Sequence, residues 1–211
     1  MYLFSRSVRL APGNVEKSLA WSFKITEKVN QIAEPEVSLW TTVFSARSGR
    51  LVWTSIVEDL VTLETVEAKL LADSGYLALV EEGAKFGSDE GVDDNLVQML
   101  FPDPRAAEVT AQYATTIQAT LAPGGMTRGA ELGVDIAQRA GKITGCPTSF
   151  AMAATGTYGA VEWITVYESI EQLQKAQETL ALDSDFTKLI DLEASKVYLT
   201  GAQQTAFRKI C

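Results

Sequence analysis

An internal repeat is the feature that most constrains what this chain can fold into. Residues 10–14 read LAPGN and residues 121–125 read LAPGG, about half of the 211-residue chain apart. At an offset of 111 residues, apolar positions coincide throughout the segment that follows each turn. The second half then lacks one residue relative to the first, so the offset falls to 110. Identical residues recur at this offset as far as Ala84 and Ala194. A match sustained over roughly a hundred residues predicts an internal duplication.

Both copies predict the same order of elements, β-α-β-β-α-β, from alternating strand patterns and amphipathic helix patterns. The first half reads as strand 2–10, helix 15–32, strands 37–46 and 50–58, a helical region broken at Asp73, and strand 95–101. The second half reads as strand 112–121, helix 126–143, a hairpin around residues 156–159, a helical region broken at Asp183, and strand 205–211. We therefore expect two ferredoxin-like units, 1–101 and 112–211, joined by a linker at 102–111.

Local signals refine this outline. Asn14 and Ser169 are placed to cap the helices that follow them, and Arg47-Ser48-Gly49 is expected to form the turn of the first hairpin. The polar stretch GSDEGVDDN at 87–95 is expected to be a solvated loop.

The segments WITVYESIEQLQKA and LDSDFTKLIDLEA of the second half carry a resemblance. With the tandem arrangement, they resemble the dimeric α+β barrel superfamily, which includes antibiotic-biosynthesis-monooxygenase-like and NIPSNAP-like domains. The resemblance implies that two antiparallel sheets close face to face into one α+β barrel with helices outside. Because this chain carries two such units, it implies an intramolecular barrel. It also implies a pocket for an aromatic or polyketide-like ligand.

Composition excludes several classes of function. The net charge of −9 and the lack of a Lys/Arg cluster disfavour nucleic acids and anionic membrane surfaces as partners. The chain has no histidine, which removes the commonest metal ligand and general base, so we expect no metal and no cofactor. Two cysteines, Cys146 and Cys211, and the absence of a signal-peptide pattern favour a cytoplasmic location.

Aromatic residues are the first candidates for ligand binding. Trp40, Trp53, Trp163 and Tyr167 could line a pocket, or they could fill the core as large aromatics commonly do. The repeat makes Trp53 equivalent to Trp163, which favours packing. With the deletion placed between Ile32 and Trp40, the repeat also pairs Trp40 with Phe150.

Two charged residues are candidates for catalysis because the halves differ there. Arg6 shares a strand face with Phe4 and Val8 and could hold an anion, or it could pair with a carboxylate such as Glu58. Glu162 lies between apolar neighbours and could be a base with a raised pKa, or it could face solvent at an edge.

Two functions follow from these candidates. The sequence favours a binding or structural module without chemistry, with a small hydrophobic molecule as its ligand. The alternative is a cofactor-independent monooxygenase or isomerase acting on an aromatic or polyketide-like substrate. Whether the protein is an enzyme stays open at this stage, and a homo-oligomer is compatible with either function. A haem-handling relative of the same superfamily is disfavoured by the missing histidine.

Overall fold

The computed structural model describes residues 1–45 and 49–211, which divide into two compact units. Unit 1 comprises Met1–Leu96 and Lys209–Cys211, and unit 2 comprises Val97–Arg208. Two strands belong to both units, because β4 (Gly87–Phe101) begins in unit 1 and β8 (Gln203–Lys209) begins in unit 2. The limits expected from the sequence, with units at 1–101 and 112–211 and a linker at 102–111, stay a prediction.

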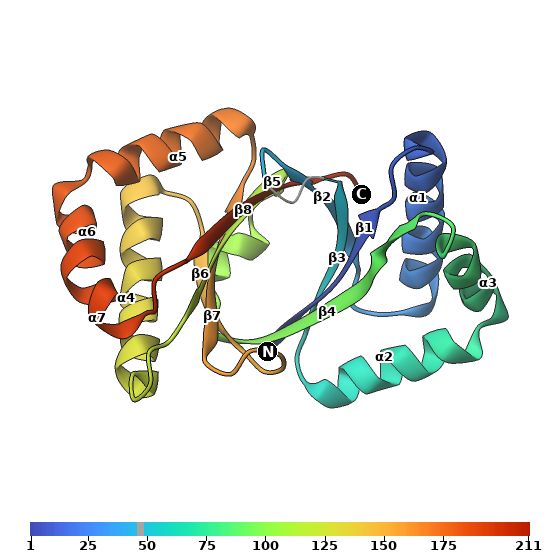
Figure 1. The fold of residues 1–211 in the computed structure, drawn as a ribbon, viewed down its shortest axis with the longest axis horizontal. Helices are drawn as coiled ribbons and strands as arrows, with labels where there is room; N and C mark the ends of the chain where they lie inside the picture. The colour runs from blue at the N-terminus through green and yellow to red at the C-terminus, as the bar shows by residue number, and fades with distance from the viewer. Residues whose placement is uncertain (46–48) are drawn as a thin grey trace. The chain divides into compact units, whose positions relative to one another are not determined.

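Unit 1 packs helices on one face of an antiparallel sheet (Figure 1). Its hydrogen-bonded strand order is β4-β1-β3-β2, and backbone bonds join the C-terminal residues 210 and 211 to Leu39 of β2. Its core includes Trp21 and Ile25 from α1, Tyr76 from α3, and Trp53 from β3. Besides β4, the elements are β1 (Tyr2–Leu10), α1 (Val15–Ile32), β2 (Ser38–Val43), β3 (Arg50–Val57), α2 (Leu60–Ala72) and α3 (Ser74–Gly83).

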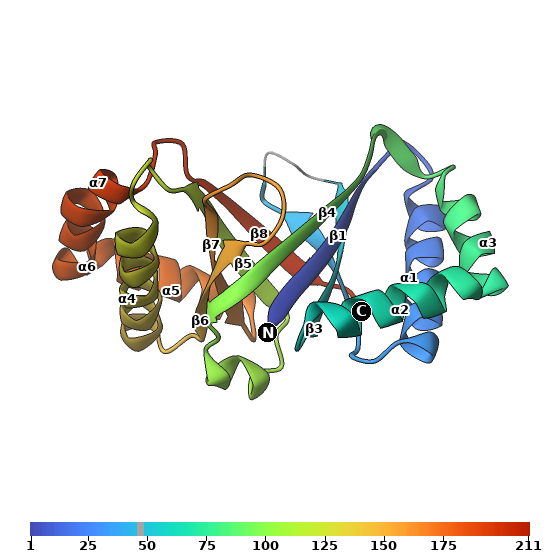
Figure 2. The same ribbon diagram turned by 90° about the horizontal axis from the view of Figure 1, so that it is seen from below.

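Unit 2 has the same plan, with its helices gathered beside its own strands (Figure 2). Its strand order is β8-β5-β7-β6, with the end of β4 beside β6. The core includes Phe150, Trp163 and Tyr198. Besides β4 and β8, the elements are η1 (Pro104–Ala107), β5 (Tyr113–Thr120), α4 (Met126–Thr144), β6 (Thr148–Ala153), β7 (Ala160–Tyr167), α5 (Ile170–Leu182), α6 (Ser184–Leu189), the π-helical turn η2 (Ile190–Ala194) and α7 (Ser195–Val197).

The strand pairing confirms the coarse fold. The hydrogen-bonded order of all eight strands, β1-β3-β2-β8-β5-β7-β6-β4, returns from β4 to β1 and is antiparallel in every register that the structure gives. The α+β class, the antiparallel pairing and a closed strand order are therefore as predicted.

The prediction of a loop at 87–95 is wrong, because these residues form the first part of β4. The segment is polar and largely exposed, so its sequence lacks the apolar alternation by which strands are recognised. Ion pairs hold this part of the strand in place instead of an apolar face, since Glu90, Asp93 and Asp94 pair with arginines of β1 and β3. Residue Gly91 adopts a φ of 79°, a left-handed conformation that glycine accepts without a steric cost.

The helix caps are partly as expected. The hydroxyl of Ser169 accepts a hydrogen bond from the Gln172 amide at 3.2 Å, so Ser169 caps α5. Asn14 precedes α1 as predicted, but it is left-handed and its side chain makes no cap hydrogen bond. Asp73 and Asp183 break the second helical regions as expected, and each carboxylate accepts amide hydrogen bonds from the next helix.

The predicted hairpins are confirmed as the antiparallel pairs β2–β3 and β6–β7. Of the first turn, Arg47 and Ser48 lie outside the described residues. The pairing of Trp40 with Phe150 is wrong. Phe150 lies opposite Trp163, whereas the residue opposite Trp53 is Leu39. Within the predicted repeat, the strand registers therefore fit a one-residue deletion between β2 and β3 and not before Trp40.

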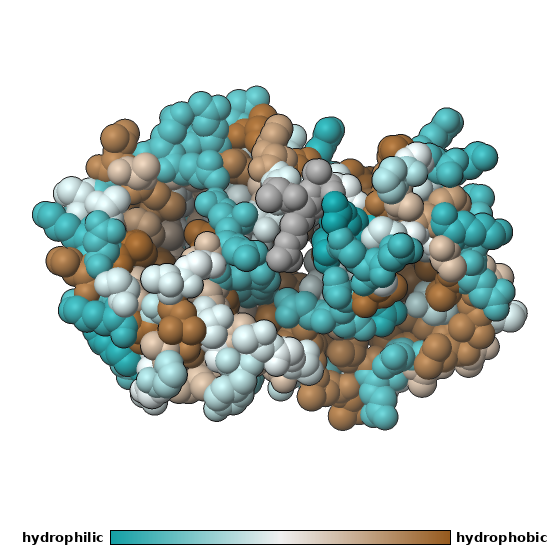
Figure 3. Space-filling view, in the orientation of Figure 1, coloured by the Kyte–Doolittle hydropathy of each residue, from teal (hydrophilic) through white to brown (hydrophobic). Residues whose placement is uncertain are grey.

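Helix α2 is the least buried long helix of unit 1. None of its residues is buried, and Leu60, Val61 and Leu71 expose between 48% and 69% of their surface. Figure 3 shows hydrophobic atoms gathered over this helix. In unit 2 the corresponding helix α5 buries Leu173 and Ala176. Helix α2 thus buries no residue, whereas the helix at the same position in unit 2 is partly buried.

Candidate functional site

A cavity of about 810 Å³ lies in unit 1, where β1 ends and α1 begins. Leu10 of β1, Leu51 of β3, Leu19 and Val15 of α1 and the C-terminal Ile210 give it an apolar lining. Arg9, Thr41, Ser88, Asp89 and Glu90 supply its polar groups. A mostly apolar concave site with a few polar side chains has the character of a small-molecule pocket.

The LAPG turn forms one wall of this cavity, since Leu10, Ala11, Pro12 and Gly13 all line it. The turn is held from both sides: the Leu10 amide donates to the Gly49 carbonyl at 2.9 Å and the Ala11 amide to the Phe86 carbonyl at 2.8 Å. The wall is therefore fixed by backbone hydrogen bonds.

Four charged residues form a cluster, which we call the Arg9–Glu90 cluster: Arg9, Arg50, Glu90 and Asp93. Of these, Arg9 and Glu90 line the cavity. Glu90 bridges two arginines, because one carboxylate oxygen pairs with Arg9 and the other lies 3.3 Å from Nη2 of Arg50. Nη1 of Arg50 also donates to Asp93 at 2.9 Å and to the Ser7 hydroxyl at 2.8 Å. The Nε of Arg50 is buried without a hydrogen-bond partner.

The four aromatic candidates do not form one site. Trp53 is buried in the core of unit 1, and its Nε1 donates to the Thr26 hydroxyl at 2.7 Å. Trp40 lies next to Leu39 on β2, so its side chain is on the opposite face of the sheet, where its Nε1 donates to Thr54 at 2.9 Å. Trp40 and Trp53 of this unit are therefore separated by their own sheet.

The remaining aromatic candidates belong to unit 2 and to two different core clusters. Trp163 packs with Phe150 and Tyr198, and its Nε1 donates to the Gly133 carbonyl at 2.9 Å. Tyr167 packs with Leu173 and bonds to the Thr115 hydroxyl at 3.0 Å. The positions and bonds of Trp53, Trp163 and Tyr167 are those of packed core residues.

Arg6 faces the helices, but its guanidinium group is already paired. Its Nε and Nη2 donate to the two carboxylate oxygens of Asp94 at 2.8 and 2.7 Å. The partner is therefore Asp94 and not Glu58. The hydrogen bonds to Asp94 raise the pKa of Arg6 above its ordinary value. Arg6 does not line the described cavity.

Glu162 is buried in unit 2, with 4% of its surface exposed, so it does not face solvent. It lies on β7 opposite Gln118 of β5, whose Nε2 donates to the Glu162 carboxyl at 3.1 Å. Burial raises the pKa of Glu162, and the single hydrogen bond from Gln118 opposes this only in part. The residue is a buried titratable group outside the described cavity.

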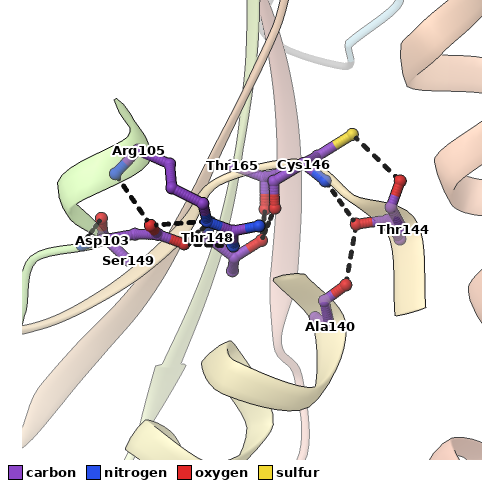
Figure 4. A network of polar contacts seen from close by, with 8 residues as sticks. All are labelled: Asp103, Arg105, Ala140, Thr144, Cys146, Thr148, Ser149 and Thr165. Atoms are coloured by element: carbon purple, nitrogen blue, oxygen red, sulfur yellow. Dashed lines mark hydrogen bonds and ion pairs between the residues drawn. The ribbon is translucent and has the colours of Figure 1, made fainter. Parts of the chain in front are cut away.

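A second polar network lies at the end of α4 in unit 2 (Figure 4). Its centre is the buried Asp103, which accepts hydrogen bonds from the side chain of Arg105 and from the Thr148 amide. The hydrogen bonds from Arg105 lower the pKa of Asp103. Cys146 is a free, fully buried thiol nearby, and burial raises its pKa. The network joins the linker to β6 through satisfied hydrogen bonds, which is a structural role.

None of the side chains singled out from the sequence lines the described cavity. The residues missed were Arg9, Asp89 and Glu90. Two features of the sequence point there: the LAPG turn, which recurs in both halves, and the acidic stretch at 87–95, for which the sequence predicts a loop. Within the described ranges, no helix is long and apolar enough to cross a membrane, and no group of three potential metal ligands is present.

No family model and no curated protein matches this sequence. Solved structures do match over its whole length. A proposed monooxygenase of Fusobacterium nucleatum superposes with a TM-score of 0.74 at 9% identity, covering 100% of this chain and 92% of its own. An anthrone oxidase-like protein gives a TM-score of 0.66 at 7% identity, covering 100% and 91%. A haem-binding protein of Thermus thermophilus gives 0.55 at 12%, covering 100% and 91%. These likenesses show a shared fold.

Haem does not fit the cavity of unit 1. The chain has no histidine, and the residues described as lining the cavity include no cysteine, methionine or tyrosine that could serve as an axial ligand. No step through haem is derived for this protein.

Proposed function

We propose that this protein is a cofactor-independent monooxygenase that takes an aromatic or polyketide-like substrate in the cavity of unit 1. The observation that carries the proposal is the cavity itself, whose 810 Å³ is large enough for a fused-ring molecule and whose lining is mainly apolar. The fold shared with proteins named as a proposed monooxygenase and an anthrone oxidase-like protein supports the same reaction class.

The polar edge of the cavity supplies the two groups that such a reaction needs. Asp89 forms no ion pair with any described residue, so its carboxylate is available to accept a proton from an activated C–H group. Arg9 also lines the cavity and would stabilise the enolate-like anion that results. The anion would then give its electrons directly to O₂.

With anthrone the proposed reaction balances without a cofactor. Loss of the ring C–H proton gives an anion, which combines with O₂ and regains the proton to form a hydroperoxide. The hydroperoxide loses water to leave the second carbonyl, so anthrone and O₂ give anthraquinone and water.

Anthrone oxidation is therefore the test. We expect wild-type protein to accelerate O₂ uptake and anthraquinone formation above the buffer rate. Leu19→Trp, which fills the cavity, and Asp89→Asn should each lower the rate at least tenfold, because they remove the space or the base. Leu192→Trp and Asp191→Asn, at exposed positions of unit 2, are the matched controls. Equal rates for Asp89→Asn and Asp191→Asn would contradict the assigned base.

A binding module without chemistry is the second candidate, and one observation favours it. Arg9 and Glu90 already neutralise one another at the edge of the cavity, as expected of a resting binding site. Saturable binding of an apolar probe, abolished by Leu19→Trp, with no O₂ uptake from anthrone or a related phenol would favour this second function.

The duplication itself supports a proposal about origin. We propose that the two units are ferredoxin-like copies of one ancestral unit, because the LAP turns are held by the same pair of backbone hydrogen bonds in both. The Leu121 amide donates to Gly159 and the Ala122 amide to Val197, as Leu10 does to Gly49 and Ala11 to Phe86. The oligomeric state stays a prediction, for which native mass spectrometry is the test.

A further inference from the structure

The Arg9–Glu90 cluster has more hydrogen-bond donors than the described structure satisfies. The two guanidinium groups carry ten N–H donors in all. Yet Glu90 is divided between Arg9 and Arg50, and Nε of Arg50 is buried with no acceptor. An unsatisfied buried donor is unfavourable, so a further oxygen acceptor would stabilise the cluster.

Glu90 is the member of the cluster that can leave most easily. Its side chain is 45% exposed, and Gly91 follows it in a left-handed conformation. Rotation of the Glu90 carboxylate toward water would therefore need no rearrangement of the core. The side chain of Arg50, by contrast, is only 16% exposed and stays anchored by Ser7 and Asp93.

Arg9 and Glu90 both line the cavity, beside an apolar part formed mainly by Leu10, Val15, Leu19 and Ile210. A ligand seated on Leu10 and Leu19 would thus bring one edge close to Arg9. Hydrogen bonds between an arginine and an anionic oxygen are stronger than those to a neutral one. A neutral apolar ligand gains nothing from this edge.

From this arrangement we infer that the cavity selects apolar molecules bearing an anionic oxygen, which takes the place of Glu90 on Arg9. The ligand class is an aromatic carboxylate, phenolate or enolate. The inference rests on the proposed function, because both use the same cavity. It names the substrate class as compounds that already carry an acidic oxygen when they bind.

Two probes with the same ring skeleton test the inference. Anilinonaphthalene sulfonate carries an anionic group, and N-phenyl-1-naphthylamine is its neutral counterpart. In fluorescence titrations of the wild-type protein we expect the sulfonate to bind about tenfold more tightly, as one charge-assisted contact would give. Equal affinity, tighter binding of the neutral probe, or no binding of either would overturn the inference.

Two variants identify the groups responsible. Glu90→Gln should tighten binding of the sulfonate about threefold or more by freeing Arg9, and Arg9→Gln should weaken it about tenfold. Binding of the neutral probe should stay within twofold in both. Glu193→Gln and Arg128→Gln, an exposed pair of unit 2 at 3.6 Å, are the matched controls. Equal losses for both probes in Arg9→Gln would show a packing role and contradict the inference.

This test is separable from that of the proposed function. Selective binding of the sulfonate without oxidation of anthrone would leave the inference standing and reject the monooxygenase. Oxidation of anthrone together with equal binding of the two probes would do the reverse.

Discussion

The two units solve one packing problem in different ways, because each surrounds its buried tryptophan with side chains from different elements. After the Ala122 amide bonds to Val197, the next residue is Tyr198, which packs edge-on against Trp163 and donates to the Gly129 carbonyl at 2.6 Å. After the corresponding bond from Ala11 to Phe86, the next residue is Gly87, which has no side chain to place. In unit 1 the edge-on partner of the tryptophan is instead Trp21 of α1, whose ring centroid lies 5.8 Å from that of Trp53, so the same place is packed from a different element.

The buried tryptophans show a second contrast. In unit 2, Trp163 donates directly to the carbonyl of Gly133 on α4. In unit 1, Trp53 donates to the hydroxyl of Thr26, which donates in turn to the Ser22 carbonyl at 2.7 Å. The predicted repeat pairs Ser22 with Gly133, so a hydroxyl bridge in one unit replaces a direct contact in the other. At this position the tryptophan of unit 2 thus bonds to the helix backbone itself, and that of unit 1 bonds to a helix side chain.

The largest expected effect comes from giving unit 2 the residue of unit 1. A Cβ atom at Gly133 would lie 2.1 Å from Cζ of Phe150, so Gly133→Ser should destabilise the protein by about 3 kcal/mol through overpacking. The reverse exchange, Ser22→Gly, should cost only about 1 kcal/mol, the usual loss for glycine in a helix. Urea unfolding measures both. A cost for Gly133→Ser no greater than that for Ser22→Gly would contradict the comparison.

Removing the hydroxyl bridge should have the next largest effect. Thr26→Val leaves the buried Nε1 of Trp53 without an acceptor and should cost about 2 kcal/mol in the free energy of unfolding. Thr26→Ser, which keeps the hydroxyl, should recover most of this loss. The paired position in unit 2 is Ala137, which has no hydroxyl. A full loss in Thr26→Ser as well would show that the methyl group, and not the bridge, matters.

Glu162 should make the stability depend on pH. Burial raises the pKa of Glu162 in the folded state, so folding favours the protonated carboxyl. The protein therefore loses stability as the pH rises above about 4.5, the ordinary pKa of glutamate, and through the higher pKa of the folded state. Glu162→Gln should therefore stabilise the protein by about 1 kcal/mol at pH 8 and have little effect at pH 4. Thermal unfolding across this range checks it. The paired position in unit 1 is Val52, so Val52→Ile serves as a control with no pH dependence. An effect of Glu162→Gln that is the same at both pH values would contradict the prediction.

Arg6 should show the smallest effect. Its ion pair with Asp94 is more than a third exposed on both sides, and such pairs contribute about 1 kcal/mol or less. Arg6→Gln should lower stability by no more than that and leave probe binding and anthrone oxidation unchanged, because Arg6 does not line the cavity. A tenfold loss of activity with unchanged stability would show that Arg6 belongs to the functional site, and would contradict its assignment as an ion-pair residue outside the cavity.

Much of the fold could be predicted because the repeat allowed each half to be checked against the other. Helix breaks at Asp73 and Asp183, the cap at Ser169 and both hairpins followed from local chemistry. The start of β4 could not be recognised, since ion pairs with distant arginines hold it in place of an apolar face.

The candidate site was much harder to predict, for a physical reason. Large aromatics and differences in charge between the halves are the features that stand out in the sequence, but Trp53 and Trp163 fill the cores and Arg6 is neutralised by Asp94. The cavity is lined by the LAPG turn, by apolar side chains from separate elements and by part of the acidic stretch, a combination that forms no catalytic pattern in the sequence.

The most direct test of the account is a titration of methyl-labelled protein with anilinonaphthalene sulfonate, followed by leucine methyl resonances in NMR spectra. The account predicts that Leu10, Leu19 and Leu51, which line the cavity of unit 1, shift together and saturate. Leu121 and Leu132, in the filled core of unit 2, should not move. Shifts confined to Leu121 and Leu132, or no shift in either set, would contradict the claim that unit 1 holds the binding site.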